Sequence, residues 1–87
     1  MDEKKFVLEI ITPELTVFKG EVKYVEAPSL VGSLGILPGH TPLLAELKSG
    51  TVRVKQPQKE NSYNVSEGFI EILPDKVRIL VEECKSC

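Results

Sequence analysis

The chain has 87 residues, of which 41% are hydrophobic and 28% charged, and its formal net charge is −2. This length allows one domain with a single thin core, and the composition is typical of a soluble globular protein. A negative net charge argues against non-specific nucleic-acid binding, which needs a basic face. No apolar run reaches the roughly 18 residues of a membrane span, and no signal-peptide core follows Met1. We therefore expect a cytosol-like compartment, no nucleic-acid partner and no direct membrane insertion.

Period-two alternation of apolar and polar residues recurs along the chain and predicts β-strands, because neighbouring side chains on a strand point to opposite faces. In residues 6–11, Phe6, Leu8 and Ile10 share one face. The pattern returns in residues 18–24, 51–55 and 76–81. Turn signals separate these runs at Thr12-Pro13, Pro28-Ser29, Pro38-Gly39, Ser49-Gly50, Gln56-Pro57, Glu67-Gly68 and Pro74-Asp75. This spacing predicts an all-β fold, a sandwich or barrel of about eight to ten short strands.

Two intervals depart from the strand pattern. Residues 43–47 have the only helix-like sequence, and it is too short to form a stable helix alone. Residues 55–64 are the most polar interval, which is typical of an exposed hairpin tip. We expect one domain over residues 1–83 and a flexible C-terminal tail over residues 84–87.

Residues 32–44 are the most unusual segment, because three glycines and two prolines stand among apolar side chains. Surface loops are ordinarily polar, since their backbone groups need water. An apolar loop therefore either enters the core or lies against another molecule. The spacing of Gly32, Gly35 and Gly39 matches neither the dinucleotide-binding nor the P-loop pattern. We interpret these glycines as positions of positive φ or of close backbone approach.

His40 is the only histidine of the chain. Histidine often serves as a catalytic base, but it needs a nucleophile and an orienting group. No activated serine or cysteine lies near it in sequence, and Pro42 favours an extended backbone at Thr41. We interpret His40 as a structural or interface residue whose ring hydrogen-bonds a loop carbonyl. We expect no catalytic, cofactor-binding or metal-ligating residue.

Alternatives stay open at two further places. Glu71 interrupts the apolar run 69–73, so its carboxylate lies either on an outer face or against a polar group of a partner. Cys84 and Cys87 form a C-x-x-C pair with no βαβ unit nearby. We interpret them as reduced thiols of a solvated tail; the alternatives are a metal site shared between two chains and a redox pair.

Taken together, the segments of this chain closely resemble the N-terminal β-sandwich of the epsilon subunit of F-type rotary ATP synthases (delta in mitochondria). The resemblance covers nearly the whole length and is strongest over residues 35–44, Gly-Ile-Leu-Pro-Gly-His-Thr-Pro-Leu-Leu. Further similar segments follow in family order at residues 8–14, 17–22, 47–53, 66–72 and 75–80. Each segment alone is weak evidence, but their co-linear order is specific.

The resemblance implies a flattened two-sheet β-sandwich of about ten strands that performs no chemistry itself. It implies a non-catalytic central-stalk subunit that binds the gamma subunit and the c-subunit ring, and so couples ion-driven rotation to ATP synthesis. The implied location is peripheral, on the cytoplasmic face of the membrane. By match to the family motif, the ring-facing residues are Ser29, Leu30, Val31, Gly32, Ser33, Pro38, Gly39 and His40, and the gamma-facing residues are Thr12, His40, Ala45 and Ser66.

This chain departs from the family pattern in two ways. The family often has an acidic residue where this chain has Ser33, and small or polar residues where it has Leu30 and Val31, which implies a more apolar contact with the ring. Many members continue into a C-terminal helical hairpin that can bind ATP, whereas this sequence ends at Cys87. Without that hairpin we expect no ATP binding.

Two other functions compete with this interpretation. The first is a free-standing small-ligand-binding β domain that uses residues 32–44 as its mouth, and a deep apolar interior pocket would favour it. The second is a metal- or redox-active dimer built on Cys84 and Cys87.

Overall fold

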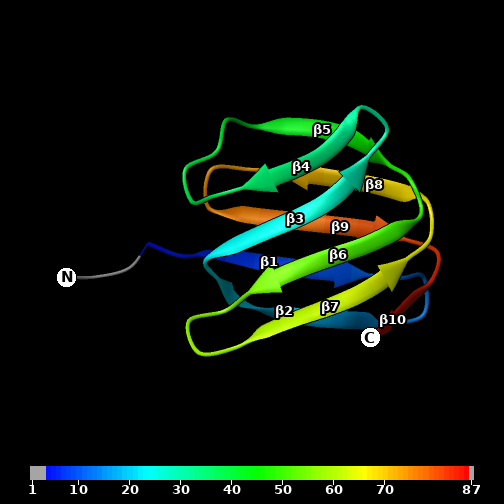
Figure 1. The fold of residues 1–87 in the computed structure, drawn as a ribbon, viewed down its shortest axis with the longest axis horizontal. Helices are drawn as coiled ribbons and strands as arrows, with labels where there is room; N and C mark the ends of the chain where they lie inside the picture. The colour runs from blue at the N-terminus through cyan, green and yellow to red at the C-terminus, as the bar shows by residue number, and fades with distance from the viewer. Residues whose placement is uncertain (1–3, 87) are drawn as a thin grey trace.

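The alternating segments form strands throughout residues 4–86, the part of the chain that the computed structural model describes. The ten strands are β1 (Phe6–Ile11), β2 (Thr16–Val22), β3 (Tyr24–Ser29), β4 (Gly32–Ile36), β5 (Leu43–Leu47), β6 (Gly50–Lys55), β7 (Glu60–Val65), β8 (Gly68–Ile72), β9 (Lys76–Val81) and β10 (Cys84–Ser86) (Figure 1). No helix occurs among the described residues. The predicted all-β fold is confirmed.

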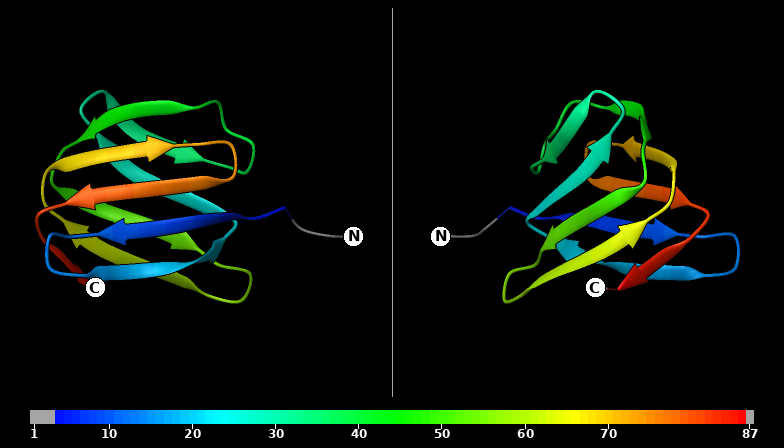
Figure 2. Two further views of the ribbon diagram at one scale, coloured as in Figure 1. Left: turned by 180° about the vertical axis from the view of Figure 1, so that it is seen from behind. Right: turned by 45° about the vertical axis from the view of Figure 1, so that its right-hand side comes forward.

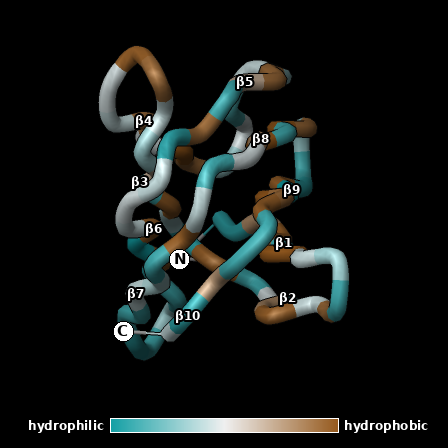
Figure 3. The backbone as a smooth tube through the Cα atoms, turned by 90° about the vertical axis from the view of Figure 1, so that its right-hand side faces the viewer, coloured by the Kyte–Doolittle hydropathy of each residue, from teal (hydrophilic) through white to brown (hydrophobic). Residues whose placement is uncertain are grey.

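The strands hydrogen-bond in the order β10-β7-β6-β3-β5-β8-β9-β1-β2, with β4 paired to β3. This sheet folds over on itself, and Figure 2 and Figure 3 show its two facing layers. One layer contains β4, β3, β6 and β7, and the other contains β5, β8, β9, β1 and β2. The layers join where β3 meets β5, at a single pairing position, Ser29 opposite Leu47. The result is a β-sandwich that nearly closes into a barrel.

Inward-facing side chains of both layers fill the space between them. Leu8 and Ile10 of β1 are completely buried, as are Val52 and Val54 of β6. Burying each such side chain contributes about 1.5–3 kcal/mol. The full core is Phe6, Leu8, Ile10, Val22, Val25, Ala27, Ile36, Leu47, Val52, Val54, Tyr63, Val65, Ile70, Ile72, Val77, Ile79 and Val81. The inward faces predicted for residues 6–11 and 76–81 are confirmed.

Residues 43–47, whose sequence is helix-like but too short for a stable helix, form β5. Leu, Ala and Glu favour helices, but only by less than about 1 kcal/mol per residue. β5 pairs with β8 over its whole length, from Leu43 opposite Ile72 to Leu47 opposite Gly68. Leu47 is 2% exposed. Backbone pairing and burial therefore outweigh the local propensity.

The structure also corrects the expected flexible tail, since Cys84–Ser86 form β10, antiparallel to β7. Cys84 is partly buried against the core. The turn before β10 is fixed by the hydroxyl of Ser66, which accepts hydrogen bonds from the backbone N–H groups of Glu82 (3.1 Å) and Glu83 (2.9 Å). Cys87 lies outside the described residues. The interpretation of Cys84 and Cys87 as a pair of reduced thiols therefore stays a prediction.

Candidate functional site

Residues 29–40, predicted to face a partner, form two turns separated by β4. Leu30 and Val31 lie at the β3–β4 turn, whereas Pro38, Gly39 and His40 lie in the loop that leads from β4 to β5 (Figure 1). Five residues of strand place these two turns roughly 17 Å apart. The segment expected to be one loop is therefore a short edge strand with a turn at each end.

The β3–β4 turn is held by Ser29 and exposes its two apolar residues. The Ser29 hydroxyl donates a hydrogen bond to the Gly32 carbonyl (2.5 Å) and accepts one from the Val31 N–H (3.3 Å). Ser29 itself is buried, but Leu30 is 59% exposed and Val31 97% exposed. Ser29 thus shapes the turn, and the two neighbouring side chains are free for contact.

The glycines in this segment have the roles predicted from the sequence. Gly32 and Gly39 have positive φ values of 123° and 83°. Gly35 lies under Tyr24, so a Cβ there would be 2.8 Å from the tyrosine hydroxyl oxygen. The predicted positive φ and close approach are confirmed.

His40 makes the hydrogen bond expected from the sequence. Its ring Nδ1 is 2.6 Å from the carbonyl oxygen of Thr41, which requires the proton on Nδ1. Its backbone N–H also donates to the carbonyl of Leu37 (3.2 Å). His40 therefore stabilises the β4–β5 loop.

Residues 27–45 contain no Asp, Glu, Lys or Arg, although 28% of the whole chain is charged. The large side chains exposed along this segment are Leu30, Val31, Leu37, Leu43 and Leu44. We call these five residues the neutral strip. Figure 3 shows the apolar colouring of the turn beside β4. Leu30, Val31 and Leu44 line one hollow, and clustered exposed apolar residues are typical of a surface that contacts another molecule.

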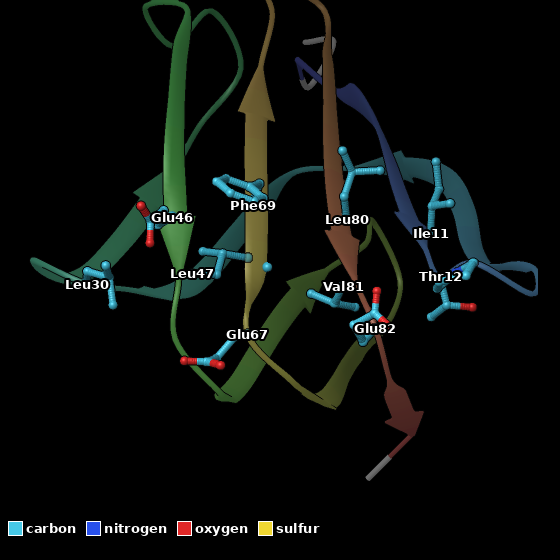
Figure 4. A pocket seen from close by; sticks show the side chains of 12 residues that line it. Ile11, Thr12, Leu30, Glu46, Leu47, Glu67, Phe69, Leu80, Val81 and Glu82 are labelled. Carbon is cyan, nitrogen blue, oxygen red and sulfur yellow. The ribbon is translucent and has the colours of Figure 1, made fainter.

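A groove of about 630 Å³ runs across the outer face of the second layer (Figure 4). It is lined by Ile11, Thr12, Pro13, Leu30, Glu46, Leu47, Glu67, Gly68, Phe69, Leu80, Val81 and Glu82. A second hollow of about 380 Å³ adjoins it and is lined by Ser29, Leu30, Val31, Leu44, Ala45, Glu46 and Phe69. Leu30, Glu46 and Phe69 line both, so the groove continues into the neutral strip.

The structure brings together some of the predicted partner-facing residues and separates others. Thr12 and Leu30 line the groove, and Ala45 lines the adjoining hollow. Ser66 precedes the groove residue Glu67, but its hydroxyl is already bonded to the turn before β10. His40 precedes the first residue of β5, whereas the groove is lined by Glu46 and Leu47 at the other end of that strand.

Sequence reasoning missed the apolar floor of the groove. Phe69 of β8 is 49% exposed and pairs with Leu80 of β9, which is 40% exposed. Leu80 in turn lies opposite Ile11 of β1. The signal was present in the sequence, because Phe69 shares its strand face with Glu71, and an outward Glu71 implies an outward Phe69.

Beside the apolar floor, the same face carries a row of paired charges. Glu9 is nearly buried and accepts a hydrogen bond from Arg78 Nε (3.1 Å). Lys76 Nζ lies 3.7 Å and Lys19 Nζ 3.6 Å from its carboxylate. Burial raises the pKa of Glu9, but the hydrogen bond from Arg78 and the charges of Lys76, Lys19 and Arg78 outweigh burial and lower that pKa below its ordinary value.

Glu71 lies on the outer face, one of the two alternatives left open by the sequence. Arg78 Nη1 is 3.8 Å from its carboxylate, so its ion pair is internal to the chain.

The remaining features bear on the competing functions. No helix in residues 4–86 has the length and apolarity needed to cross a bilayer. Among those residues, no three His, Cys, Asp or Glu side chains are grouped closely enough to hold a metal ion. The space between the layers is filled by core side chains, and the groove lies on the outer surface.

The family model and the similar proteins all indicate the same protein family. Residues 5–86 match the model of the ATP synthase delta/epsilon chain β-sandwich domain. The ATP synthase epsilon chain of Nitrosomonas europaea is 42% identical over 78 residues, which are 88% of this chain and 56% of that protein. This chain therefore spans about half the length of that relative. The epsilon chain of Chlorobaculum tepidum is 43% identical over 82 residues, 93% of each chain.

A solved structure of the Euglena gracilis mitochondrial ATP synthase, comprising OSCP, F1 and c-ring, contains a chain with the same fold. The TM-score is 0.89 at 21% identity, and the match covers 94% of this chain and 53% of the other.

Proposed function

This chain belongs to the ATP synthase delta/epsilon β-sandwich family, and from that premise we propose that it is a non-catalytic central-stalk subunit of an F-type ATP synthase. In this role it binds the gamma subunit and the c-subunit ring, and it transmits ion-driven rotation toward ATP synthesis. Its location is peripheral, on the cytoplasmic face of the energy-transducing membrane.

One observation carries this proposal: among the described residues, Leu30, Val31 and Leu44 stand exposed around one hollow of the sandwich. Val31 is 97% exposed at the β3–β4 turn, and Leu44 is 68% exposed on β5. Both belong to the neutral strip, which contacts the ring in this proposal. The internally hydrogen-bonded turn keeps the strip in shape, which suits a contact that must bear torque.

The gamma subunit binds the second layer in this proposal. Thr12 and Ala45, which the family resemblance implies to be gamma-facing, line the groove and its adjoining hollow on this layer. Ser66 supports this surface by fixing the β9–β10 turn. His40 contributes at the other end of β5, by holding the loop that joins the neutral strip to this layer.

No observation favours the small-ligand-binding alternative, because the interior pocket that it needs is occupied by the core. We also expect residues 4–86 to have no affinity for ATP.

Co-purification tests the proposed function. The tagged chain is mixed separately with the gamma subunit and with the detergent-solubilised c-ring of the same complex. We expect stable association with both. Association with neither would overturn the proposal. ATP binding to the purified chain, measured by calorimetry, would contradict the expectation for the nucleotide.

A further inference from the structure

The groove on the second layer combines an apolar floor with negative charge, and this combination indicates what kind of molecule binds there. Three carboxylates, Glu46, Glu67 and Glu82, stand around its apolar floor, and no Lys or Arg lines it. None of the three has an ion pair with another described residue. By contrast, Glu9, Glu26, Glu60 and Glu71, which lie on the strand faces, are all paired with Lys or Arg. The groove therefore presents uncompensated negative charge beside an apolar surface.

The three strands that carry the apolar floor of the groove exclude an extended peptide that pairs by its backbone. β5 lies between β3 and β8, β8 between β5 and β9, and β9 between β8 and β1. β1 is likewise flanked on both sides, by β9 and β2. β5 meets β3 only at Ser29 and Leu47, but β8, β9 and β1, whose side chains form the floor, have both edges paired, so they offer no free N–H or C=O row to an added strand. An occupant must pack through its side chains.

The floor matches the spacing of one face of a helix. Phe69 lies opposite Leu80, and Leu80 opposite Ile11, so this apolar row crosses three adjacent strands. Adjacent strands are about 4.8 Å apart. Residues three or four apart on one helix face are separated by about 4.5–6 Å along the axis, because each residue rises about 1.5 Å. A strand would offer side chains on one face only every ~6.6–6.8 Å, a poorer match.

We propose that the groove binds an amphipathic helix of the gamma subunit whose apolar stripe is flanked by Lys or Arg. The apolar stripe covers Phe69, Leu80 and Ile11, and the basic residues pair with Glu46, Glu67 and Glu82. The groove extends from β5 to β1, about 14 Å across three strand spacings. About ten helical residues span this distance. This inference rests on the proposed function and adds the chemistry of the gamma-facing contact.

Calorimetric titration of the full chain with the gamma subunit tests the inference. Phe69→Ser removes the largest apolar side chain of the floor, and we expect it to weaken binding at least tenfold. Leu37→Ser is the matched control, because Leu37 is similarly exposed (60%) but lies outside the groove. Thermal unfolding of each variant shows whether the fold is retained.

Charge reversal tests the contribution of the carboxylates that surround the groove. We expect Glu46→Lys/Glu82→Lys to weaken binding at least tenfold at about 0.1 M salt. The deficit should shrink at about 1 M salt, where the screening length falls from about 10 Å to about 3 Å. Glu21→Lys/Asp75→Lys changes the net charge equally at the opposite end of the same layer and should bind like the unmodified chain.

The outcomes separate this inference from the proposed function. If the unmodified chain binds gamma and the groove variants bind equally well, the inference is wrong and the proposed function stands. If the unmodified chain binds neither gamma nor the c-ring, both are wrong. Sedimentation of the chain alone gives a third outcome: self-association that Phe69→Ser abolishes would make a second copy the occupant and overturn the inference.

Discussion

Glu9 illustrates how single residues shape the outer face of the second layer. Its side chain is 11% exposed and lies within 4 Å of three cationic groups, on Lys19, Lys76 and Arg78. A nearly buried carboxylate costs free energy unless it is paired and hydrogen-bonded. These cations come from β2 and β9, so the Glu9 cluster ties three strands together.

We expect Glu9→Gln to lower the free energy of unfolding at neutral pH. We also expect the free energy of unfolding of this variant to fall less steeply as the pH is lowered. Because the folded pKa of Glu9 is lowered below its ordinary value of 4.5, its ionised form stabilises the fold above that pH. This contribution is lost as the pH falls through the folded pKa. Urea unfolding between about pH 7 and pH 3 measures the effect. Glu21→Gln, a change at an exposed residue of β2, is the control. The prediction is contradicted if the free energy of unfolding of Glu9→Gln falls with pH as steeply as that of the unmodified chain.

Ser66→Ala should destabilise the chain by about 1–3 kcal/mol, because two backbone N–H groups of the β9–β10 turn lose their acceptor. For a domain of this size, each 1 kcal/mol lowers the Tm by about 4–8 °C. Thermal unfolding followed by circular dichroism measures the shift. Ser62→Ala on β7 is the matched control. Equal Tm values for the two variants would show that the hydroxyl of Ser66 does not hold the turn.

At this scale the sequence predicted some contacts and not others. Alternation with Leu8 and Ile10 already placed Glu9 on an outward face. It did not identify Lys76 and Arg78 as its partners, because strand pairing over such separations depends on the topology. The hydrogen bond of His40 was predictable because its acceptor is the next residue in the chain.

At the scale of strands, Gly68 explains how β8 can pack closely against β9. A Cβ at this position would lie 2.0 Å from the carbonyl oxygen of Leu80 and 2.8 Å from Val81 Cγ1. The first of these neighbours is backbone, which cannot move without disturbing the pairing of the two strands.

Gly68→Ala should therefore cost about 3 kcal/mol or more. Urea unfolding monitored by circular dichroism measures the loss. Gly20→Ala in β2 is the control, since its nearest contact would be Phe18 Cζ at 3.5 Å, an ordinary distance. A similar small change in both variants would mean that the β8–β9 contact relaxes freely.

The strands that were predicted and those that were missed differ in a physical way. β1, β6 and β9 carry their own alternation, so their local sequence suffices. β4 contains two glycines and β5 consists of helix-favouring residues, and both are strands because neighbouring strands pair with them. β10 is likewise held by β7 and by the turn at Ser66. The groove depends on the register across four strands, which no local pattern contains.

At the scale of the whole molecule, the two proposed contacts differ in electrostatics. The neutral strip has no ionisable group, whereas the groove has three unpaired carboxylates. Surface charge pairs are screened by salt, and apolar contacts are not. We therefore expect salt to weaken binding to gamma and to leave binding to the c-ring unchanged.

Val31→Asp tests the strip directly. Because Val31 is 97% exposed, this change should alter stability by no more than about 0.5 kcal/mol. It should weaken binding to the c-ring more than binding to gamma, because Val31 lines the hollow that adjoins the groove but not the groove itself. Co-sedimentation with c-ring and calorimetry with gamma measure the two effects. Lys59→Asp in the turn between β6 and β7 is the control. Undiminished ring binding by Val31→Asp would exclude the strip from the contact.

The parallel pairing of β1 with β9 has a consequence for synthesis. Val7 lies opposite Lys76, so the neighbour that β1 needs is made 69 residues later. At about 5–20 residues per second, a ribosome takes about 3–14 s to produce that interval. The nascent β1 and β2 can form a hairpin in this time, yet one edge of β1 stays open until β9 emerges. We therefore expect a chaperone that binds the nascent chain to protect it most during this interval, while the edge of β1 is unpaired.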